Sequence, residues 1–138
     1  MRVLIDTNVI VDALTSREPW NKSAEQIFLM AAHKSADMYI SASMATDIYY
    51  LVRKYCHDTE LAMQTMEKLY NLFGILDVTK KDCIQALTSS VHDYEDAVVC
   101  EVAKRSGMHY IVTRNTKDYV NSYVKAILPD EFIERISD

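Results

Sequence analysis

The amino-acid sequence predicts one α/β domain, residues 1–138, in which a mainly parallel sheet of four or five strands is flanked by helices. Short apolar runs alternate along the chain with longer segments whose apolar residues recur at helical spacing. The short runs, such as Val3-Leu4-Ile5, lack the polar alternation of a strand with one wet face, which indicates strands covered on both faces. A length of 138 residues with 49% hydrophobic residues suits a single core.

The first half of the chain is expected to contain three strands and four helices. The apolar run at residues 3–5 ends abruptly, and Asp6 or Thr7 can then cap a helix. Residues 41–43 offer a cap for a later helix, and Gly74 is expected to end the fourth one. In order, the expected elements are strand 3–5, helix 7–14, helix 23–33, strand 38–40, a helix that runs to about Tyr55, helix 59–73 and strand 75–76.

The second half repeats the alternation of helices and strands. Thr79 can cap a helix over 80–90, and the helix that contains Asp96 is expected to end at Gly107. Strands are expected at 109–113 and 126–128 with a loop between them, and Pro129 can begin a short last helix. Because ligands of such folds bind beyond the carboxyl ends of the parallel strands, polar residues there are the candidates for a site.

Asp96 is the polar residue that is hardest to explain by structure alone. In a helix, Val99, Cys100 and Ala103 follow it by three, four and seven positions, so its carboxylate lies in the middle of an apolar stripe. Burying an unpaired carboxylate is costly enough that such a group is normally neutralised, ion-paired or bound to a metal. The sequence therefore predicts that other residues join Asp96.

Four other oxygen-bearing side chains are expected near the same edge of the sheet. Asp6 closes the first strand, and Asn115 and Asp118 follow the strand at 109–113. Asp47 and Asp96 lie near helix starts, which belong to that edge as well. Like charges packed together repel, so a divalent cation between them is the economical solution.

The expected ligands are all oxygens, without supporting His or Cys. Such a set suits Mg²⁺ or Mn²⁺ rather than Zn²⁺. Carboxylate-held ions of this kind lower the pKa of a bound water for attack on phosphorus, and a second ion can stabilise the leaving oxygen. The predicted chemistry is phosphodiester hydrolysis.

Composition argues against several other kinds of protein and binding site. A formal net charge of −5 argues against a broad basic surface that grips nucleic acid, although a local basic patch stays open. The two glycines are too few for a glycine-rich phosphate loop. Three cysteines without metal-type spacing are expected to be reduced thiols. Without a targeting segment or an apolar run of about 18 residues, the expected location is the cytoplasm, with no membrane partner.

At these residues the chain resembles the PIN-domain family of small Mg²⁺/Mn²⁺-dependent nucleases, and within it the VapC-like toxins of toxin–antitoxin pairs. The resemblance covers essentially the whole length, so the α/β fold is expected to be one PIN-like nuclease domain. Its carriers are Leu4-Ile5-Asp6-Thr7-Asn8, Ser43 through Asp47-Ile48-Tyr49-Tyr50, Asp93-Tyr94-Glu95-Asp96-Ala97 and Val112-Thr113-Arg114-Asn115-Thr116-Lys117-Asp118-Tyr119.

The resemblance assigns the acidic positions. The first and third acids of the family map onto Asp6 and Asp96, and the second, usually Glu, maps onto Asp47. These three are the expected metal ligands. The fourth acid maps onto Asn115, with Asp118 as a nearby substitute or addition that completes the catalytic set. The resemblance also implies a homodimer, a cognate antitoxin protein that reaches into the acidic pocket, and a structured RNA substrate such as tRNA or rRNA.

Five further residues complete the predicted site. Asn8 and Thr113 match family positions that orient it. Arg114, Lys117 and Arg17 are candidates for contacts with RNA phosphates, and Arg114 is the best of them because it adjoins the site.

Structural roles compete with these assignments. Asp6 can be only a helix cap, and Asp47 can serve only the dipole of its helix. Asn115 and Asp118 are common turn residues. Asp12 shares a helix face with Asn8 but is expected to be solvated.

Three other functions stay open at this point. One is a degenerate PIN domain that binds RNA or a protein without cutting, because positions 47 and 115 depart from the family pattern. A second is a phosphotransferase with Asp6 as nucleophile, which needs an acid where this chain has Asn8. A third is a signalling receiver, which needs a lysine after a late strand, where this chain has Thr113-Arg114.

Overall fold

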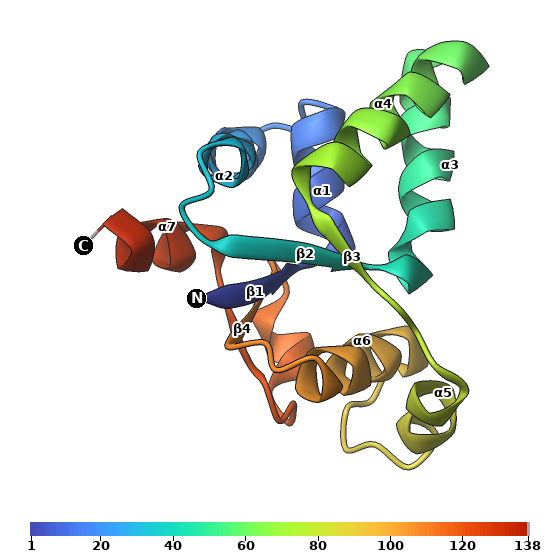
Figure 1. Ribbon diagram of the computed structural model, residues 1–138, viewed down its shortest axis with the longest axis vertical. Coiled ribbons are helices and arrows are strands. Elements are labelled where there is room, and N and C mark those ends of the chain that lie inside the picture. Colours follow the sequence, from blue (N-terminus) through green and yellow to red (C-terminus); the bar gives the residue numbers. More distant parts are fainter. Residues whose placement is uncertain (138) are drawn as a thin grey trace.

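A computed structural model describes residues 1–137 and shows five strands in one wholly parallel sheet (Figure 1). The order across the sheet is β3-β2-β1-β4-β5. The central strand β1 therefore pairs with β2 on one side, where Leu4 faces Tyr39, and with β4 on the other, where Ile5 faces Val112. The strands are β1 (Arg2–Ile5), β2 (Asp37–Ser41), β3 (Gly74–Leu76), β4 (Tyr110–Val112) and β5 (Lys125–Ile127).

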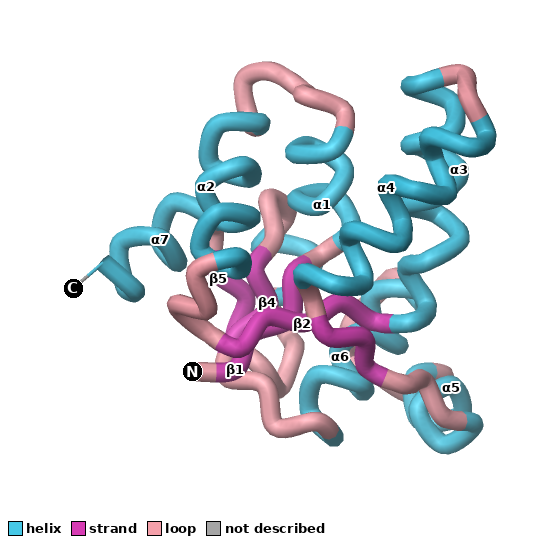
Figure 2. The backbone as a smooth tube through the Cα atoms, turned by 45° about the horizontal axis from the view of Figure 1, so that its top comes forward, coloured by secondary structure: helices cyan, strands magenta, loops and turns pink. Residues whose placement is uncertain are grey.

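Helices cover both faces of this sheet. Figures 1 and 2 show the first four helices on one side of the strands, and α5 with α6 on the other. The last helix, α7, packs against α2. The α-helices are α1 (Thr7–Leu14), α2 (Asn21–Ala32), α3 (Ala45–Cys56), α4 (Thr59–Leu72), α5 (Lys80–Ala86), α6 (Tyr94–Arg105) and α7 (Pro129–Ser137).

The central strand is buried on both faces, as its apolar sequence predicted. Val3, Leu4 and Ile5 are all fully buried. Burial of such side chains contributes about 1.5–3 kcal/mol each, so the strand is a main source of stability and a rigid support for Asp6 at its end.

The chain order creates a crevice beside β1. From β1 the chain proceeds outward through β2 and β3, and then returns to the other side of β1 for β4 and β5. The direction of travel therefore reverses between β1 and β4, and ligands of open parallel sheets bind at such a point, beyond the carboxyl ends of the two strands. Asp6 leaves β1 and Thr113 leaves β4 at this place.

Two predicted elements differ from the structure. The helix expected over 80–90 ends at Ala86, and in the turn after it, the Ser89 hydroxyl accepts the Val91 amide at 3.0 Å. Serine hydroxyls compete in this way with helix hydrogen bonds. The loop expected after β4 contains a 3₁₀ helix, η2 (Thr116–Tyr119), and another, η1 (Ala42–Met44), precedes α3.

Two sequence expectations concern the whole chain. In the part that the structure describes, no helix is long and apolar enough to cross a membrane. Cys56, Cys83 and Cys100 are free thiols, as predicted, and burial raises the pKa of Cys100 to about 11. The Cys100 thiol is therefore protonated at neutral pH.

Candidate active site

Asp6 caps α1 and also occupies the centre of the crevice. Its Oδ1 accepts the Thr7 amide at 2.8 Å, and its Oδ2 accepts hydroxyl groups from Thr113 at 2.9 Å and Tyr119 at 3.0 Å. The side chain is buried. Burial raises the pKa of Asp6 above its usual range, although these three hydrogen bonds oppose the shift. A simple surface cap would have no such penalty.

Asp96 approaches from the opposite layer. It lies in the first turn of α6, where its own amide donates to the carboxylate of the N-cap residue Asp93 at 3.0 Å. Burial, with the added negative charge of Asp6, raises the pKa of Asp96 to about 6. The helix places this carboxylate beside an apolar row in which Val99 and Cys100 are buried, as its spacing predicted.

Tyr119 joins the two carboxylates and was missed as a site residue by sequence reasoning. Its hydroxyl lies 3.0 Å from Oδ2 of Asp6 and 3.1 Å from Oδ1 of Asp96, and the side chain is only 2% exposed. Burial and the two negative charges raise the pKa of this phenol, so it stays protonated. The only sequence signal for it was an aromatic residue directly after Asp118, in a segment without periodicity.

Asn8 and Thr113 connect the ends of β1 and β4. The Asn8 amide nitrogen donates to Thr113 Oγ1 at 3.1 Å, and its oxygen accepts the backbone amide of Arg114 at 3.2 Å. Thr113 is fully buried and also accepts the Asn115 amide at 3.1 Å. The structure thus brings both residues to Asp6, where they fix the orientation of its carboxylate.

Asp6 and Asp96 line a cleft of about 700 Å³. The three other predicted oxygen-bearing residues lie on its walls: Asp47, Asn115 and Asp118. Asn115 and Asp118 are exposed on the η2 side, and Asp118 is close enough for its charge to raise the pKa of both Asp6 and Asp96. Asp47 lines the cleft from α3.

Asp47 does not face inward as predicted. It is exposed on α3, although it lines the cleft. The buried side chains of α3 are Ile48 and Val52, and Met44, just before the helix, is buried as well. Asp47 lies at the solvent edge of this row and is a wall residue of the cleft.

Comparison with known proteins identifies the fold. The model of the PIN-domain family matches residues 2–117. The chain belongs to the PIN-domain family. PIN nucleases generally use divalent metal ions. The prediction of a single PIN-like α/β domain with a parallel sheet is confirmed.

Similar proteins extend this finding. Ribonuclease VapC1 of Aquifex aeolicus (strain VF5) is 25% identical over 139 residues, which cover 97% of this PIN domain and 94% of the relative. VapBC2 from Rickettsia felis, bound to a promoter DNA fragment, has a TM-score of 0.69 at 17% identity, covering 93% of this chain and 98% of that one. Mycobacterium tuberculosis VapC20, a toxin that cleaves the sarcin–ricin loop, has a TM-score of 0.62 at 15% identity, with 79% and 86% covered.

The three basic residues predicted to contact RNA differ in whether their charge is already paired within the protein. Arg114 is bound by Asp12, which is 1% exposed, and its guanidinium also lies 4.0 Å from the centre of the Trp20 ring. The expectation that Asp12 is solvated is therefore wrong, and the guanidinium of Arg114 is largely engaged within the protein. Lys117 and Arg17 are exposed, and within residues 1–137 neither forms an ion pair.

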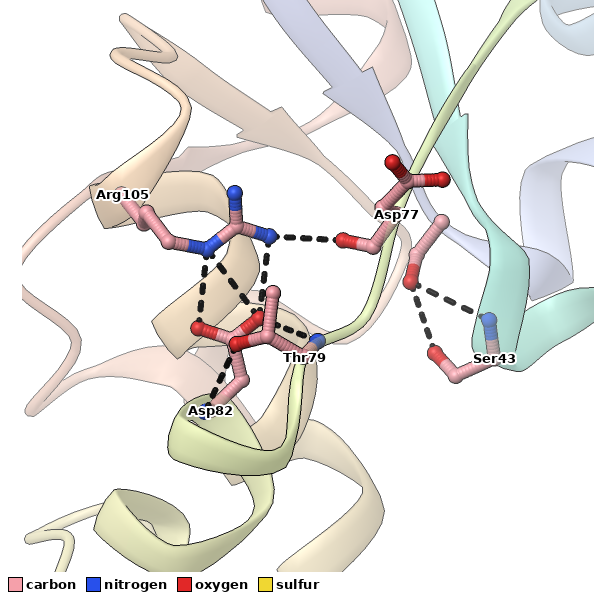
Figure 3. A network of polar contacts seen from close by, with 6 residues as sticks. Ser43, Asp77, Thr79, Asp82 and Arg105 are labelled. Atoms are coloured by element: carbon pink, nitrogen blue, oxygen red, sulfur yellow. Dashed lines mark hydrogen bonds and ion pairs between the residues drawn. The ribbon is translucent and has the colours of Figure 1, made fainter.

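A second polar network joins α5 to the end of α6 (Figure 3). Arg105, at the end of α6, donates to both carboxylate oxygens of Asp82 and to the carbonyl of Asp77. Asp82 also accepts the Thr79 amide in a capping box that begins α5. Burial acts to raise the pKa of Asp82, but the hydrogen bonds from Arg105 and Thr79 outweigh it and hold that pKa below its usual value. Arg105 thus fixes α5 against α6.

The donor set of the PIN domain fits a hard divalent ion. Within residues 1–137, no three His, Cys, Asp or Glu side chains converge closely enough to hold an ion by themselves. Asp6 and Asp96 supply two carboxylates whose mutual charge is unfavourable without a cation. Mg²⁺ is commonly held by one or two carboxylates while it keeps several waters, so this pair is a sufficient protein contribution.

Proposed function

We propose that this PIN domain is a metal-dependent endoribonuclease, and that it is the toxin of a type II toxin–antitoxin pair. The observation that carries the proposal is the pair of carboxylates, buried Asp6 and partly buried Asp96, at the reversal point of the sheet and lining a cleft of about 700 Å³. Two acids with raised pKa that line one cleft support a functional site there.

The relatives support the kind of reaction. The Aquifex relative is named a ribonuclease over nearly the same length, and VapC20 is described as a toxin that cleaves the sarcin–ricin loop. By the same comparison we propose a structured RNA, tRNA or rRNA, as the substrate of this chain. VapBC complexes among the similar folds support a cognate antitoxin partner, and the family resemblance suggests a homodimer.

Each residue has a role in this proposal. Asp6 and Asp96 hold Mg²⁺ or Mn²⁺, which when bound supplies an activated water and neutralises charge on the scissile phosphate. Asn8 and Thr113 keep the Asp6 carboxylate oriented. Asp118 and Asn115 complete the wall on one side, and their exposed position allows them to reach water or phosphate.

Three exposed side chains act at the rim of the cleft. Asp47 contributes through water, because it is exposed and lines the cleft from α3. Arg17 lines the cleft and Lys117 extends from η2, so both can contact RNA phosphates. Their charge partly offsets the acidic lining that RNA must approach.

A cleavage assay tests the proposal. Purified protein is incubated with a tRNA and rRNA pool in Mg²⁺, Mn²⁺ or EDTA, alongside Asp96→Asn and the control Asp37→Asn. Asp37 is an exposed carboxylate at the start of β2, the opposite end of the sheet. We expect cleavage by wild type and the control in either metal, and none in EDTA or by Asp96→Asn. Cleavage by a clean preparation of Asp96→Asn would exclude the assignment.

A degenerate PIN domain is the second candidate. The observation that favours it is that Asp47 is exposed and that no three His, Cys, Asp or Glu side chains within residues 1–137 converge to hold an ion. Such a protein would fold, bind Mn²⁺ and RNA, and show no turnover with any RNA of the pool.

A further inference from the structure

The Tyr119 hydroxyl is placed between two carboxylates but has one proton to give. It lies within 3.1 Å of both Oδ2 of Asp6 and Oδ1 of Asp96. A phenol donates one hydrogen bond, so it can satisfy one carboxylate at a time. The hydroxyl is held at this point because the ring of Tyr119 is buried, although its neighbours Asp118 and Val120 are exposed.

The acceptor capacity of one oxygen of Asp6, Oδ2, is already used. Its Oδ1 takes the Thr7 amide, and its Oδ2 takes the hydroxyls of Thr113 and Tyr119, with the Asn8 amide at 3.4 Å. A carboxylate oxygen offers about two lone-pair directions, so a cation cannot bind Oδ2 while every donor stays.

Only one of these donors is free to leave. Thr7 donates from the backbone of α1, which Asp6 itself caps. Thr113 follows β4 directly, is fully buried, and is held by Asn8 and by the amide of Asn115. Tyr119 comes from the short η2 segment and reaches Asp6 from the side of Asp96 and the cleft.

We propose that Tyr119 is a positioning residue that competes with a divalent ion for Asp6, because its hydroxyl lies between Asp6 and Asp96 and must leave Oδ2 of Asp6 before an ion can use that oxygen. The inference rests on the proposed function, since it concerns the same two carboxylates. It goes further by assigning to Tyr119 a cost of ion binding: one charge-assisted hydrogen bond is exchanged for each ion bound.

A purely structural role of Tyr119 needs the ring and not the hydroxyl. The aromatic ring anchors η2 in the core, and phenylalanine would fill nearly the same volume. The two hydrogen-bond partners of the hydroxyl are both proposed metal ligands. Its removal should therefore change ion binding, whereas removal of a packing hydroxyl would leave ion binding unchanged.

Calorimetric titration with Mn²⁺ alone tests this at pH 7 on wild type, Tyr119→Phe and the control Tyr123→Phe. Tyr123 belongs to the same segment, is 80% exposed, and has no contact with either carboxylate. We expect Tyr119→Phe to bind Mn²⁺ about tenfold more tightly than wild type, in line with the loss of one competing hydrogen bond to a charged group. Tyr123→Phe should match wild type.

Thermal unfolding gives a second readout that needs no activity. In EDTA, Tyr119→Phe should melt below wild type, because the carboxylates have lost a hydrogen-bond donor. Saturating Mn²⁺ should raise its melting temperature by more than it raises that of wild type.

Equal or weaker Mn²⁺ binding by a folded Tyr119→Phe would overturn the role of the hydroxyl, as would the absence of Mn²⁺ binding by both proteins. Neither readout depends on RNA cleavage. The nuclease assignment is judged separately, by whether wild type cuts RNA in Mn²⁺, so one idea can fail without the other.

Discussion

Arg114 and Asp12 form a two-pronged ion pair between the segment after β4 and the buried side of α1. Nε of Arg114 lies 2.6 Å from one carboxylate oxygen of Asp12, and Nη2 lies 3.1 Å from the other. Trp20 covers the guanidinium at 4.0 Å. The pair fixes the backbone beside Thr113 and so supports the side chains that orient Asp6.

Breaking this pair should destabilise the fold strongly. Asp12→Ala leaves the Arg114 charge partly buried without a partner, and we expect a loss of about 3 kcal/mol in the free energy of unfolding. Urea denaturation measures it. The double variant Asp12→Ala/Arg114→Ala should lose less than the sum of the single losses, and simple additivity would contradict a direct pair.

Neutralising Asp96 should stabilise the metal-free protein. Its pKa of about 6 lies above the usual aspartate value, so its ionised form opposes folding. In EDTA at pH 7.5, we expect Asp96→Asn to melt higher than wild type by roughly 4 °C, the shift that about 1 kcal/mol produces in a chain of this size. A lower melting temperature, with Asp37→Asn unchanged, would contradict this. It would show that a group of the protein itself stabilises the Asp96 carboxylate without an ion.

The same pKa fixes how stability changes with pH. A folded-state pKa above the unfolded one means that the folded protein binds more protons, so stability is lost as pH rises through about 6. Wild type in EDTA should therefore unfold at higher temperature at pH 5.5 than at pH 7.5. Asp96→Asn should show a flatter profile over this window, because only Asp6, whose pKa is also raised, then contributes.

The two sides of the cleft should differ in their effect on metal affinity. Asp47 is exposed on the wall of the cleft, so Asp47→Asn is expected to weaken Mn²⁺ binding less than about tenfold. Asp96→Asn should weaken it by more than about a hundredfold, because a direct carboxylate ligand is lost. Calorimetric titration compares the two, and equal losses would place Asp47 among the direct ligands.

Exposed cations at the rim should affect RNA affinity alone. Lys117→Ala and Arg17→Ala each remove one charge near the cleft, and each should reduce the slope of log affinity against log salt by about one. Binding is measured with the inactive Asp96→Asn background to prevent cleavage. An unchanged slope would show that RNA takes another path, and unchanged Mn²⁺ affinity is the internal control.

The sequence predicted the elements well because strands and helices here differ in the period of their apolar residues. Asp6 and Asp96 could be paired from sequence because one ends a buried strand and the other interrupts an apolar helix face. Both features are local, and the parallel arrangement of the strands then brings them to one edge.

The parts that were missed depend on contacts between distant segments. Tyr119 reaches the centre through η2, a single 3₁₀ turn with no periodic pattern. Asp12 looked solvated because its partner, Arg114, lies in a segment far along the sequence. Asp47 was predicted to face inward because it adjoins the apolar row of α3. Neighbouring positions of a helix point in different directions, so Ile48 is buried while Asp47, one residue earlier, is exposed.

The place of β4 in the sheet sets when the site can exist during synthesis. β1 is synthesised well before its second neighbour, Tyr110–Val112, and Tyr119 comes later still. A nascent chain that ends before this point carries Asp6 and Asp96 without the strand that seats Thr113 beside them. The site therefore cannot assemble until the segment through Tyr119 has been synthesised.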